Sequence, residues 1–560
     1  MTLLPTTERA ATAGPMHTRA PVLAWLATGV AALIAVPILS VAVNLFIGGT
    51  SDTWSHLAAT VLPSYVANTL WLCVGVSAGV ILIGVATAWV VSTYEFPGRR
   101  IFEWAVVLPL AVPAYVMAYT YTDLLQFVGP VQTWLRAAFG WQAGGYWFPD
   151  VRTLGGAIAM FVFVLYPYVY LLTRAAFLAR TTGMLEAGRT LGLGPWASFF
   201  RIALPLARPA VAAGASLALM ETLADYGAVS YFGVQTFTTG IYRAWFGLGD
   251  RTAAAQLAAG LLGAVALVLF LERLSRGRAR FHNTTGRNRS GRGRALRGGK
   301  ALAAMLVCLL PLTVGFLVPA GVLLRFAITD GDAQFGQRFV QLAQNSFVVA
   351  AFTSALAVLL ALVLGYAART TRRAFPRIVN RTVGLGYALP GSVIAVGVLI
   401  PVTHLDNALA AAITAATGYR PGLLLTGGIA ALIYAYLVRF LTVSLQTVEA
   451  GLGKVTTSID DAARSLGCGA RETLWRVHFP LLRGSLLTAG LLVFVDVMKE
   501  LPATLVMRPF NFDTLATQAY TLASDERLAE ASTAALAIVV VGILPLIVIS
   551  RQIARQRQSA

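Results

Sequence analysis

Glu186-Ala-Gly-Arg-Thr-Leu-Gly192, followed by Arg201-Ile-Ala-Leu-Pro205, recurs without gaps as Asp461-Ala-Ala-Arg-Ser-Leu-Gly467 and Arg476-Val-His-Phe-Pro480. Every matched pair has the same separation along the chain, and chance does not hold one register over so long a stretch. The same shift matches further residues: Glu221 with Asp496, Asp225 with Glu500, Phe237 with Phe512, and Thr239 with Thr514. Upstream, two short motifs recur at slightly larger shifts: Asn68-Thr69 as Asn345-Ser346, and Leu108-Pro109 as Leu389-Pro390. The sequence therefore predicts two parallel repeats.

The composition around these motifs is that of a membrane protein. Of 560 residues, 57% are hydrophobic and only 12% are charged, whereas soluble domains carry roughly 25% charged residues. A bilayer core needs about 20 mostly apolar helical residues. Twelve such runs are present, near residues 21–47, 65–93, 101–125, 154–178, 209–232, 253–274, 301–326, 345–368, 378–401, 422–446, 480–505 and 529–550. We expect an all-α polytopic membrane protein with six spans in each half.

The predicted organisation has five parts. Residues 1–20 form a tail, 21–274 the first transmembrane domain, 275–300 a basic linker, 301–550 the second transmembrane domain, and 551–560 a second tail. The first apolar run is too long for the core of a signal peptide, which has about 7–15 residues, so we interpret it as a retained span.

Basic residues set the orientation. With both termini placed in the cytoplasm, 33 of the 43 Lys and Arg residues fall in cytoplasmic segments, including Arg439, and Lys499 lies within a span. This bias predicts cytoplasmic termini and explains the net charge of +19 without a nucleic-acid partner. The linker carries ten of these residues, and it is interpreted as a solvated tether; contact with lipid headgroups is the alternative.

Both copies of the repeated motif fall between the fourth and fifth spans of their half, on the predicted cytoplasmic side. Each is expected to form two short helices, with Glu186 or Asp461 in a first helical turn, where a carboxylate suits the helix dipole. Gly192 and Gly467 permit the left-handed backbone that ends a helix. Pro205 then marks the start of the next membrane helix, as does Pro480. A single copy would suit an amphipathic connector, but two registered copies on one side favour a docking role.

These motifs resemble the coupling loop of the permease subunits of ATP-binding-cassette (ABC) importers, which has the pattern E-A-A, then G after three intervening residues, then I-x-L-P. The matching residues are Glu186, Ala187, Gly192, Leu204 and Pro205 in the first copy and Asp461, Ala462, Ala463, Gly467 and Pro480 in the second. The chain departs from the pattern at Gly188, Asp461, Val477 and Phe479.

The resemblance implies the partners. Each loop would seat one of two copies of a cytoplasmic ATPase subunit, which would use ATP and Mg²⁺, so that this chain binds no cofactor itself. A periplasmic substrate-binding protein would deliver the cargo, and the location would be a bacterial inner membrane.

The stretches that follow each loop, from Glu221 to Trp245 and from Asp496 to Thr517, are similar to the fused permeases of ferric-iron importers. Thiamine importers share the fused architecture, so thiamine or another small solute is the alternative cargo.

The residues themselves support a pathway for a cation. Glu221 with Asp225, and Asp496 with Glu500, are carboxylate pairs at i, i+4, which predicts one helix face for each pair. Carboxylates at membrane depth are costly unless they face a partner or water. Fe³⁺ prefers oxygen ligands, which these acids, Tyr226 or Tyr231 offer. Structural pairing, with Lys499 as the partner of Asp496 or Glu500, is the alternative.

Two other classes of function fit less well. No G-x-x-x-x-G-K-[ST] motif is present, and the five His and three Cys residues are dispersed, so we expect no catalytic residue and name no metal ligand. An ion-coupled secondary carrier also uses repeats and intramembrane acids, but it would not need paired docking loops.

Overall fold

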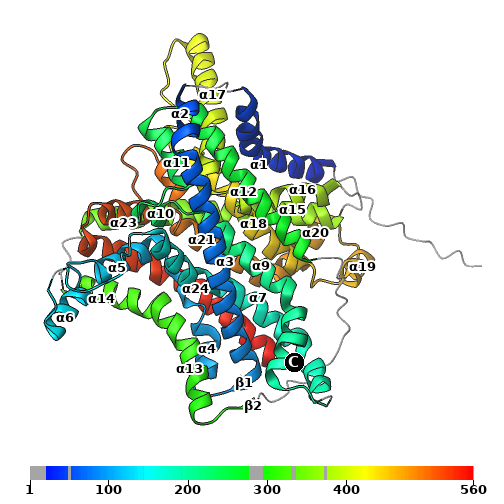
Figure 1. Cartoon of the computed structure of the whole chain (residues 1–560). Coiled ribbons are helices and arrows are strands. Elements are labelled where there is room, and N and C mark those ends of the chain that lie inside the picture. Colours follow the sequence, from blue (N-terminus) through cyan, green and yellow to red (C-terminus); the bar gives the residue numbers. More distant parts are fainter. Residues whose placement is uncertain are drawn as a thin grey trace, which may run out of the picture.

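The computed structural model describes residues 21–47, 52–142, 144–190, 192–276, 294–329, 336–370 and 375–558. These residues are mostly helical (Figure 1). The predicted tail at residues 1–20 and most of the predicted linker lie outside the described residues.

The elements of the first half are α1 (Pro21–Ile47), α2 (Asp52–Thr60), α3 (Leu62–Thr93), β1 (Tyr94–Glu95), α4 (Arg99–Ala105), η1 (Leu108–Ala111), α5 (Ala114–Leu125), α6 (Pro130–Phe139), α7 (Leu154–Thr190), α8 (Pro195–Ser198), η2 (Phe199–Ala203), α9 (Leu204–Ala224), α10 (Gly227–Tyr231), α11 (Phe237–Tyr242), η3 (Arg243–Gly247) and α12 (Arg251–Arg276).

The elements of the second half are β2 (Arg294–Ala295), α13 (Gly299–Leu312), η4 (Thr313–Leu317), α14 (Val318–Thr329), α15 (Gln337–Thr370), α16 (Phe375–Val383), η5 (Gly386–Ala388), α17 (Gly391–Thr417), α18 (Ala430–Leu452), α19 (Thr457–Ser465), α20 (Ala470–Thr473), η6 (Leu474–His478), α21 (Phe479–Met498), α22 (Pro502–Met507), α23 (Leu515–Ser524) and α24 (Leu528–Gln558).

The predicted membrane spans are confirmed in number. Within the described residues, 11 helices are long and apolar enough to cross a bilayer, or 12 when one bent pair counts as a span. The bent pair is the predicted third span, which is not one straight helix. Residues 99–111 and 114–139 meet at 91°, because Pro113 adopts an extended backbone between them. In the second half, Pro390 separates α16 and η5 from α17 in the same way.

The repeat is visible in the backbone. The elements α8, η2 and α9 recur as α20, η6 and α21 at the shift that the sequence motifs predict. After the short helices α10 and α22 the two halves no longer align at this shift. The equivalent capping boxes begin at Thr236 and Thr514, which are further apart along the chain than the paired loop residues are. The predicted match of Thr239 with Thr514 is therefore wrong, since the structural equivalent of Thr514 is Thr236.

The recurring asparagines explain why the upstream motif is repeated. Asn68 donates a hydrogen bond to the Gln235 carbonyl at 2.9 Å, and Asn345 donates to the Asp513 carbonyl at 3.0 Å. Each asparagine thus ties the second span of its half to the loop that begins the later capping box. The same contact at equivalent places makes the two halves structural copies.

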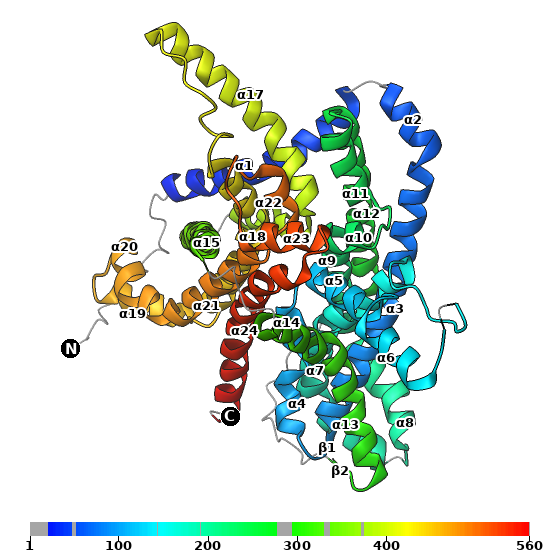
Figure 2. The same ribbon diagram turned by 90° about the vertical axis from the view of Figure 1, so that its left-hand side faces the viewer.

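The first helices of the halves are exchanged. Helix α1 packs against α15, α16 and α17 of the second half, while α13 packs against α3 and α4 of the first. Figure 2 shows α13 beside α4 and β1, far from the body of the second half. Helix α17 also packs on α12 before it projects beyond the body. The halves are therefore interlocked.

The end of the predicted linker is structured. Arg294 and Ala295 pair in parallel with Tyr94 and Glu95, and the Leu296 amide donates to the Glu95 carbonyl at 2.8 Å. Helix α12 extends slightly past the predicted domain boundary, to Arg276. At the other end, α24 continues to Gln558, so most of the predicted tail at 551–560 prolongs the last helix.

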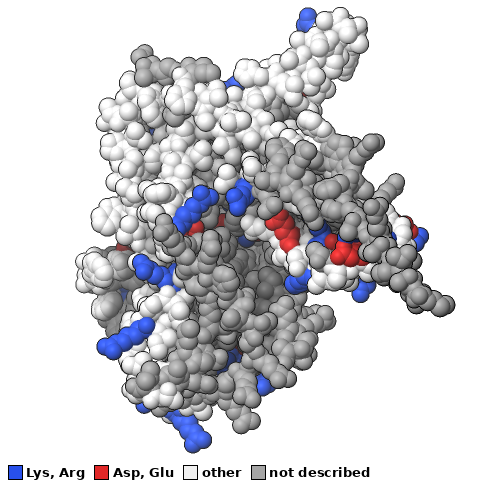
Figure 3. All heavy atoms as spheres, turned by 90° about the vertical axis from the view of Figure 1, so that its right-hand side faces the viewer, with Lys and Arg blue, Asp and Glu red and all other residues white. Residues whose placement is uncertain are grey.

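Charge is unevenly distributed on the surface. In the view of Figure 3, broad white areas carry no Lys, Arg, Asp or Glu, and most charged side chains lie at the middle and bottom. Many large apolar side chains are exposed, such as Leu82, Leu267 and Leu487. Exposed apolar side chains over so many helices are expected of a surface that faces lipid.

Candidate functional site: a central charged cavity and two repeated loops

The halves enclose a cavity of about 100 Å³, with room for several water molecules. Helices α5, α7 and α9 of the first half line it, together with η5, α18, α21 and the segment after α21 in the second. Its polar residues are the acids Glu221, Asp225, Asp496 and Glu500, the cations Arg439 and Lys499, and the phenols Tyr115, Tyr168 and Tyr387. The four predicted pathway acids are thus brought together at one place.

The acids of the first half have different partners. Glu221, in the last turn of α9, accepts a hydrogen bond of 2.8 Å from the Tyr387 hydroxyl of the second half. Asp225 follows the end of α9 in an extended conformation. Its Oδ1 accepts from the amides of Ala228 at 2.8 Å and Val229 at 3.4 Å. A carboxylate there caps α10 and satisfies amides that have no partner within the helix.

The acids of the second half repeat this division of roles. Asp496 lies in α21, 3.0 Å from the Lys499 ammonium, as the structural-pairing alternative expects. Glu500 follows α21 and caps α22: its carboxylate accepts from the Ala503 amide at 2.9 Å and from the Thr504 amide and hydroxyl at 3.0 and 2.6 Å.

The prediction that each acid pair shares one helix face is wrong. Helix α9 ends at Ala224 and α21 at Met498, so Asp225 and Glu500 lie beyond the helices. The membrane helix stops at this point because the second acid of each pair binds the amides of the following short helix instead. Tyr226 does not line the cavity; its ring stacks on Tyr242 with centroids 3.7 Å apart.

Arg439 joins the two halves across the cavity. One guanidinium nitrogen lies 3.7 Å from Glu221 and another 3.4 Å from Glu500, and the residue is 8% exposed. Counting Arg439 among the cytoplasmic residues was wrong, since it projects from the middle of α18. Its counterpart at the shift that relates the two loops is Val164, so the bridging cation comes from the second half alone.

Both repeated loops have the predicted glycine stop. Gly192 and Gly467 have φ values of +80° and +84°. The following amides reach back to the same carbonyls in each copy, Leu193 to Gly188 at 2.9 Å and Cys468 to Ala463 at 3.0 Å. This is the six-to-one hydrogen bond of a helix that ends in a left-handed residue.

The next helix begins earlier than predicted in both copies. A π-helical turn, η2 or η6, joins the short α8 or α20 to the long membrane helix. Pro205 and Pro480 are the second residues of α9 and α21. A proline ring clashes with the carbonyl four residues back in a regular α-helix, and the wider π turn accommodates it. The prolines therefore mark the π turn, and the helical segment itself starts at Pro195 and at Ala470.

Aromatic rings hold the first loop. Trp89 of α3 contacts Phe177 of α7 and Phe199 of η2, with ring centroids 5.4 and 5.0 Å apart. Contrary to the prediction of two short helices, α7 runs unbroken from the fourth span through the motif to Thr190. Glu186 and Ala187 lie in that helix, and their side chains are outside the described ones.

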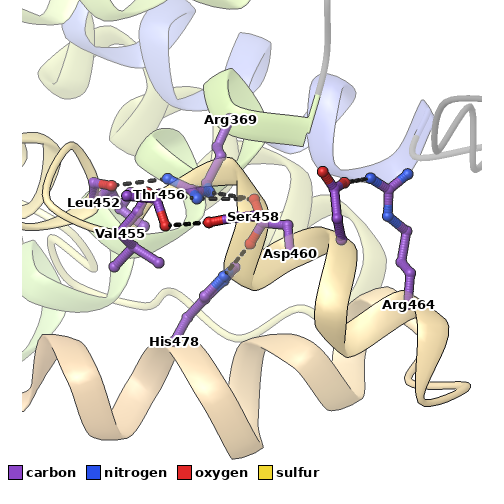
Figure 4. A network of polar contacts seen from close by, with 9 residues as sticks. Arg369, Leu452, Val455, Thr456, Ser458, Asp460, Arg464 and His478 are labelled. Carbon is purple, nitrogen blue, oxygen red and sulfur yellow. Dashed lines mark hydrogen bonds and ion pairs between the residues drawn. The ribbon is translucent and has the colours of Figure 1, made fainter.

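An ionic cluster holds the second loop (Figure 4). The Asp460 carboxylate lies 2.8 Å from Arg369 Nη2 and 2.6 Å from His478 Nε2. Arg369 also donates to the carbonyls of Leu452 and Val455 at 2.8 and 2.9 Å. Here α18 ends at Leu452 and α19 is a separate short helix, as predicted. Asp461, the predicted docking acid, follows the first turn of α19 instead of lying in it as predicted. Asp461 and Ala462 are exposed, whereas Ala463 is buried.

A family model matches this chain. The model, described as "Binding-protein-dependent transport system inner membrane component", covers residues 80–279. This range begins within α3, includes the first repeated loop and ends just after α12.

Curated relatives extend the likeness to both halves. The Fe(3+)-transport system permease protein of Haemophilus influenzae is 26% identical, over 87% of this chain and 89% of its own length. The ferric transport system permease protein of Actinobacillus pleuropneumoniae is 24% identical, over 87% of this chain and 71% of its own. The sulfate transport system permease protein of Escherichia coli is 32% identical over 27% of this chain and 51% of its own. Residues 80–279 are therefore a permease domain of a binding-protein-dependent transport system, and the likeness to curated permeases runs over both halves of the polypeptide.

Proposed function

We propose that this permease imports a metal cation, ferric iron, across a bacterial inner membrane. Two observations support this cargo. The relatives that cover most of the chain are named as ferric permeases, and the cavity between the halves contains four carboxylates but only two cationic side chains. An excess of carboxylates attracts a cation and repels an anion such as sulfate. The carboxylates also offer the oxygen atoms that hard cations prefer.

The partners proposed for this import follow from the loops. One copy of an ATPase subunit would dock at each loop, at the helix ends beside Gly192 and Gly467. The matching glycine stops and π turns support two equivalent docking sites, since two identical partners need two similar backbones. ATP and Mg²⁺ would be bound by those subunits, and this chain would catalyse no reaction. With the loops in the cytoplasm, both termini lie there too, and a periplasmic binding protein delivers the cargo on the opposite side.

The geometry suggests how transport proceeds. Closure of the ATPase pair would draw the two loops together and move the halves relative to each other. Arg439 spans the halves through Glu221 and Glu500, so this bridge must lengthen when the cavity opens. An incoming cation can then replace Arg439 as the partner of Glu221. The capping bonds of Asp225 and Glu500 lie within single halves, so they are kept during the movement.

Uptake in a strain with and without this chain tests the cargo. We expect ⁵⁵Fe uptake to depend on the chain, while uptake of radiolabelled thiamine and of ³⁵S-sulfate does not. Dependence of thiamine uptake alone would replace iron with the alternative cargo. Reconstituted vesicles test the energy source: uptake that continues without the ATPase but stops when the ion gradient is dissipated would identify a secondary carrier.

A further inference from the structure

Two buried tyrosines on α5 have no polar partner. Tyr115 and Tyr119 are 4% and 2% exposed, and their hydroxyl groups make no hydrogen bond to any described residue. Leaving a buried hydroxyl unpaired costs about 1–3 kcal/mol. Tyr121 on the same helix behaves differently, since its hydroxyl donates to the Val314 carbonyl at 2.6 Å. The two unpaired phenols therefore need an explanation other than packing.

The phenols lie between two cavities. Tyr115 lines the central cavity, while Thr122 and Gln126, at the other end of α5, line a second cavity of about 540 Å³. The second cavity is formed by α5, α6 and the segment that leads to α7. That segment joins the third and fourth spans, so it lies on the opposite side of the membrane from the cytoplasmic loops.

Residues on one face of α5 line both cavities. Tyr115, Tyr119, Thr122 and Gln126 follow the i, i+4, i+7, i+11 spacing of a single helix face, and we call these four residues the α5 stripe. From Tyr115 to Thr122 the helix rises about 10 Å at 1.5 Å per residue. Tyr121 is not on this face.

Contacts around Tyr119 continue the stripe toward the second cavity. Its ring meets the Tyr231 ring edge-on, with centroids 6.4 Å apart. The Arg152 guanidinium lies 5.1 Å from the Tyr231 ring, and Arg152 lines the second cavity. A cationic side chain already occupies an aromatic face at this position, which shows that the surroundings suit a positive charge.

We propose that the α5 stripe is the route by which the cation passes from the second cavity to the central one, with the Tyr115 and Tyr119 hydroxyl oxygens as its contacts. Neutral hydroxyl oxygens suit a hard cation and, unlike carboxylates, do not hold it by charge. The acids then receive the cation at the inner end of the stripe, where Tyr115, Asp225 and Glu500 line one cavity. The proposal rests on the proposed function in taking the cargo to be a cation.

Removing single oxygen atoms tests the route. We expect Tyr115→Phe and Tyr119→Phe each to lower the maximal rate of ⁵⁵Fe uptake about tenfold, at unchanged membrane level and with the partner ATPase and binding protein present. The matched control, Tyr121→Phe, loses a structural hydrogen bond on the same helix and should stay within about twofold of the unmodified chain. A Tyr115→Phe/Tyr119→Phe double variant that transports at the full rate overturns the proposal.

A second measurement does not depend on the cargo. In a chain whose Cys73, Cys308 and Cys468 are replaced by Ser, Tyr119→Cys should react with a water-soluble cationic thiol reagent added outside during turnover. Its labelling should be at least tenfold faster than that of Tyr121→Cys. Equal labelling of both variants refutes the route. If Tyr119→Cys labels rapidly but the unmodified chain moves no iron, the proposed cargo fails and the route remains.

Discussion

The two repeated loops have the same backbone conformation but are anchored by different side chains. Each loop ends a helix at a left-handed glycine and begins the next one with a π turn before a proline. The first is fixed by Trp89 against Phe177 and Phe199, whereas the second is fixed by Asp460 between Arg369 and His478. Glycine and proline thus set the shape of the loop, and the contacts that anchor it can be apolar or ionic.

The halves differ in the same way elsewhere. Glu103 and Arg174 form a buried ion pair between α4 and α7. At the equivalent place between α16 and α18, Asn380 donates to Glu449 at 2.6 Å. The repeated backbone keeps the position of a polar brace while the charges change. The two loops can therefore respond differently to salt and to mutation.

The aromatic anchor should give the largest effect. Replacing a buried Trp by Ala costs about 3–5 kcal/mol, so Trp89→Ala should lower the thermal unfolding temperature of the detergent-solubilised chain. Hydrogen exchange should rise in η2 and stay unchanged in η6. An equal rise in both loops would show that the two anchors act as one unit and would remove the basis of the comparison.

The ionic anchor should give a smaller effect, confined to the other loop. Asp460→Asn takes the charged partner from Arg369 and from the buried His478, at a cost of about 1–3 kcal/mol. Exchange should then rise in α19 and η6. Asp461→Asn is the matched control. The Asp461 carboxylate is next to Asp460 in sequence but is largely exposed, and among the described residues it pairs only with Arg464, a contact worth at most about 1 kcal/mol. If both variants behave alike, the Asp460 cluster does not anchor the loop.

The shared backbone predicts equal effects in the two halves. Gly192→Ala and Gly467→Ala should each cost about 1–2 kcal/mol, since a side chain is strained at positive φ. A Cβ at either position would meet no atom within 4 Å, so strain is the only cost. Gly194→Ala and Gly469→Ala have equally open surroundings without a positive φ and should unfold at the temperature of the unmodified chain. Unequal effects of the first two variants would contradict the shared loop geometry.

A change in salt concentration should give the smallest effect on hydrogen exchange, and it should distinguish the ionic anchor from the aromatic one. At 1 M salt the screening length falls to about 3 Å, which weakens the partly exposed Arg369–Asp460 pair. Exchange in α19 should rise a few-fold between low and high salt, while exchange in η2 does not rise. A similar rise in η2 would mean that salt loosens the whole cytoplasmic face instead of one anchor.

The sequence predicts those parts of the fold that a local rule dictates. Membrane spans follow from run length because the bilayer requires it, and Gly192 and Gly467 end helices because few other residues adopt positive φ. The meeting of Glu221, Asp225, Asp496 and Glu500 in one cavity agrees with the repeat, since equivalent residues of two related halves approach each other where the halves meet.

Other features depend on neighbours that are distant in sequence. Asp225 and Glu500 were expected within helices, since i, i+4 spacing suits a helix, and only the short helix that follows each shows that they are caps. Arg439 lies within the apolar run at residues 422–446 but was assigned to the cytoplasm because it is charged, although Glu221 of the other half compensates its charge. The phenols of α5 are ordinary members of an apolar run until the cavities at both ends are known.

The exchange of first helices affects the order in which helices can pack during synthesis of the chain. Helix α1 packs on α17, and more than half of the chain lies between Ile47, where α1 ends, and Gly391, where α17 begins. At about 5–20 residues per second, synthesis of that stretch takes on the order of tens of seconds. During this interval α1 can pack on α12 of its own half, but its surface for α17 stays without its partner, which the apolar character of that surface allows in a membrane. The first half therefore cannot reach its final packing before much of the second half has been made.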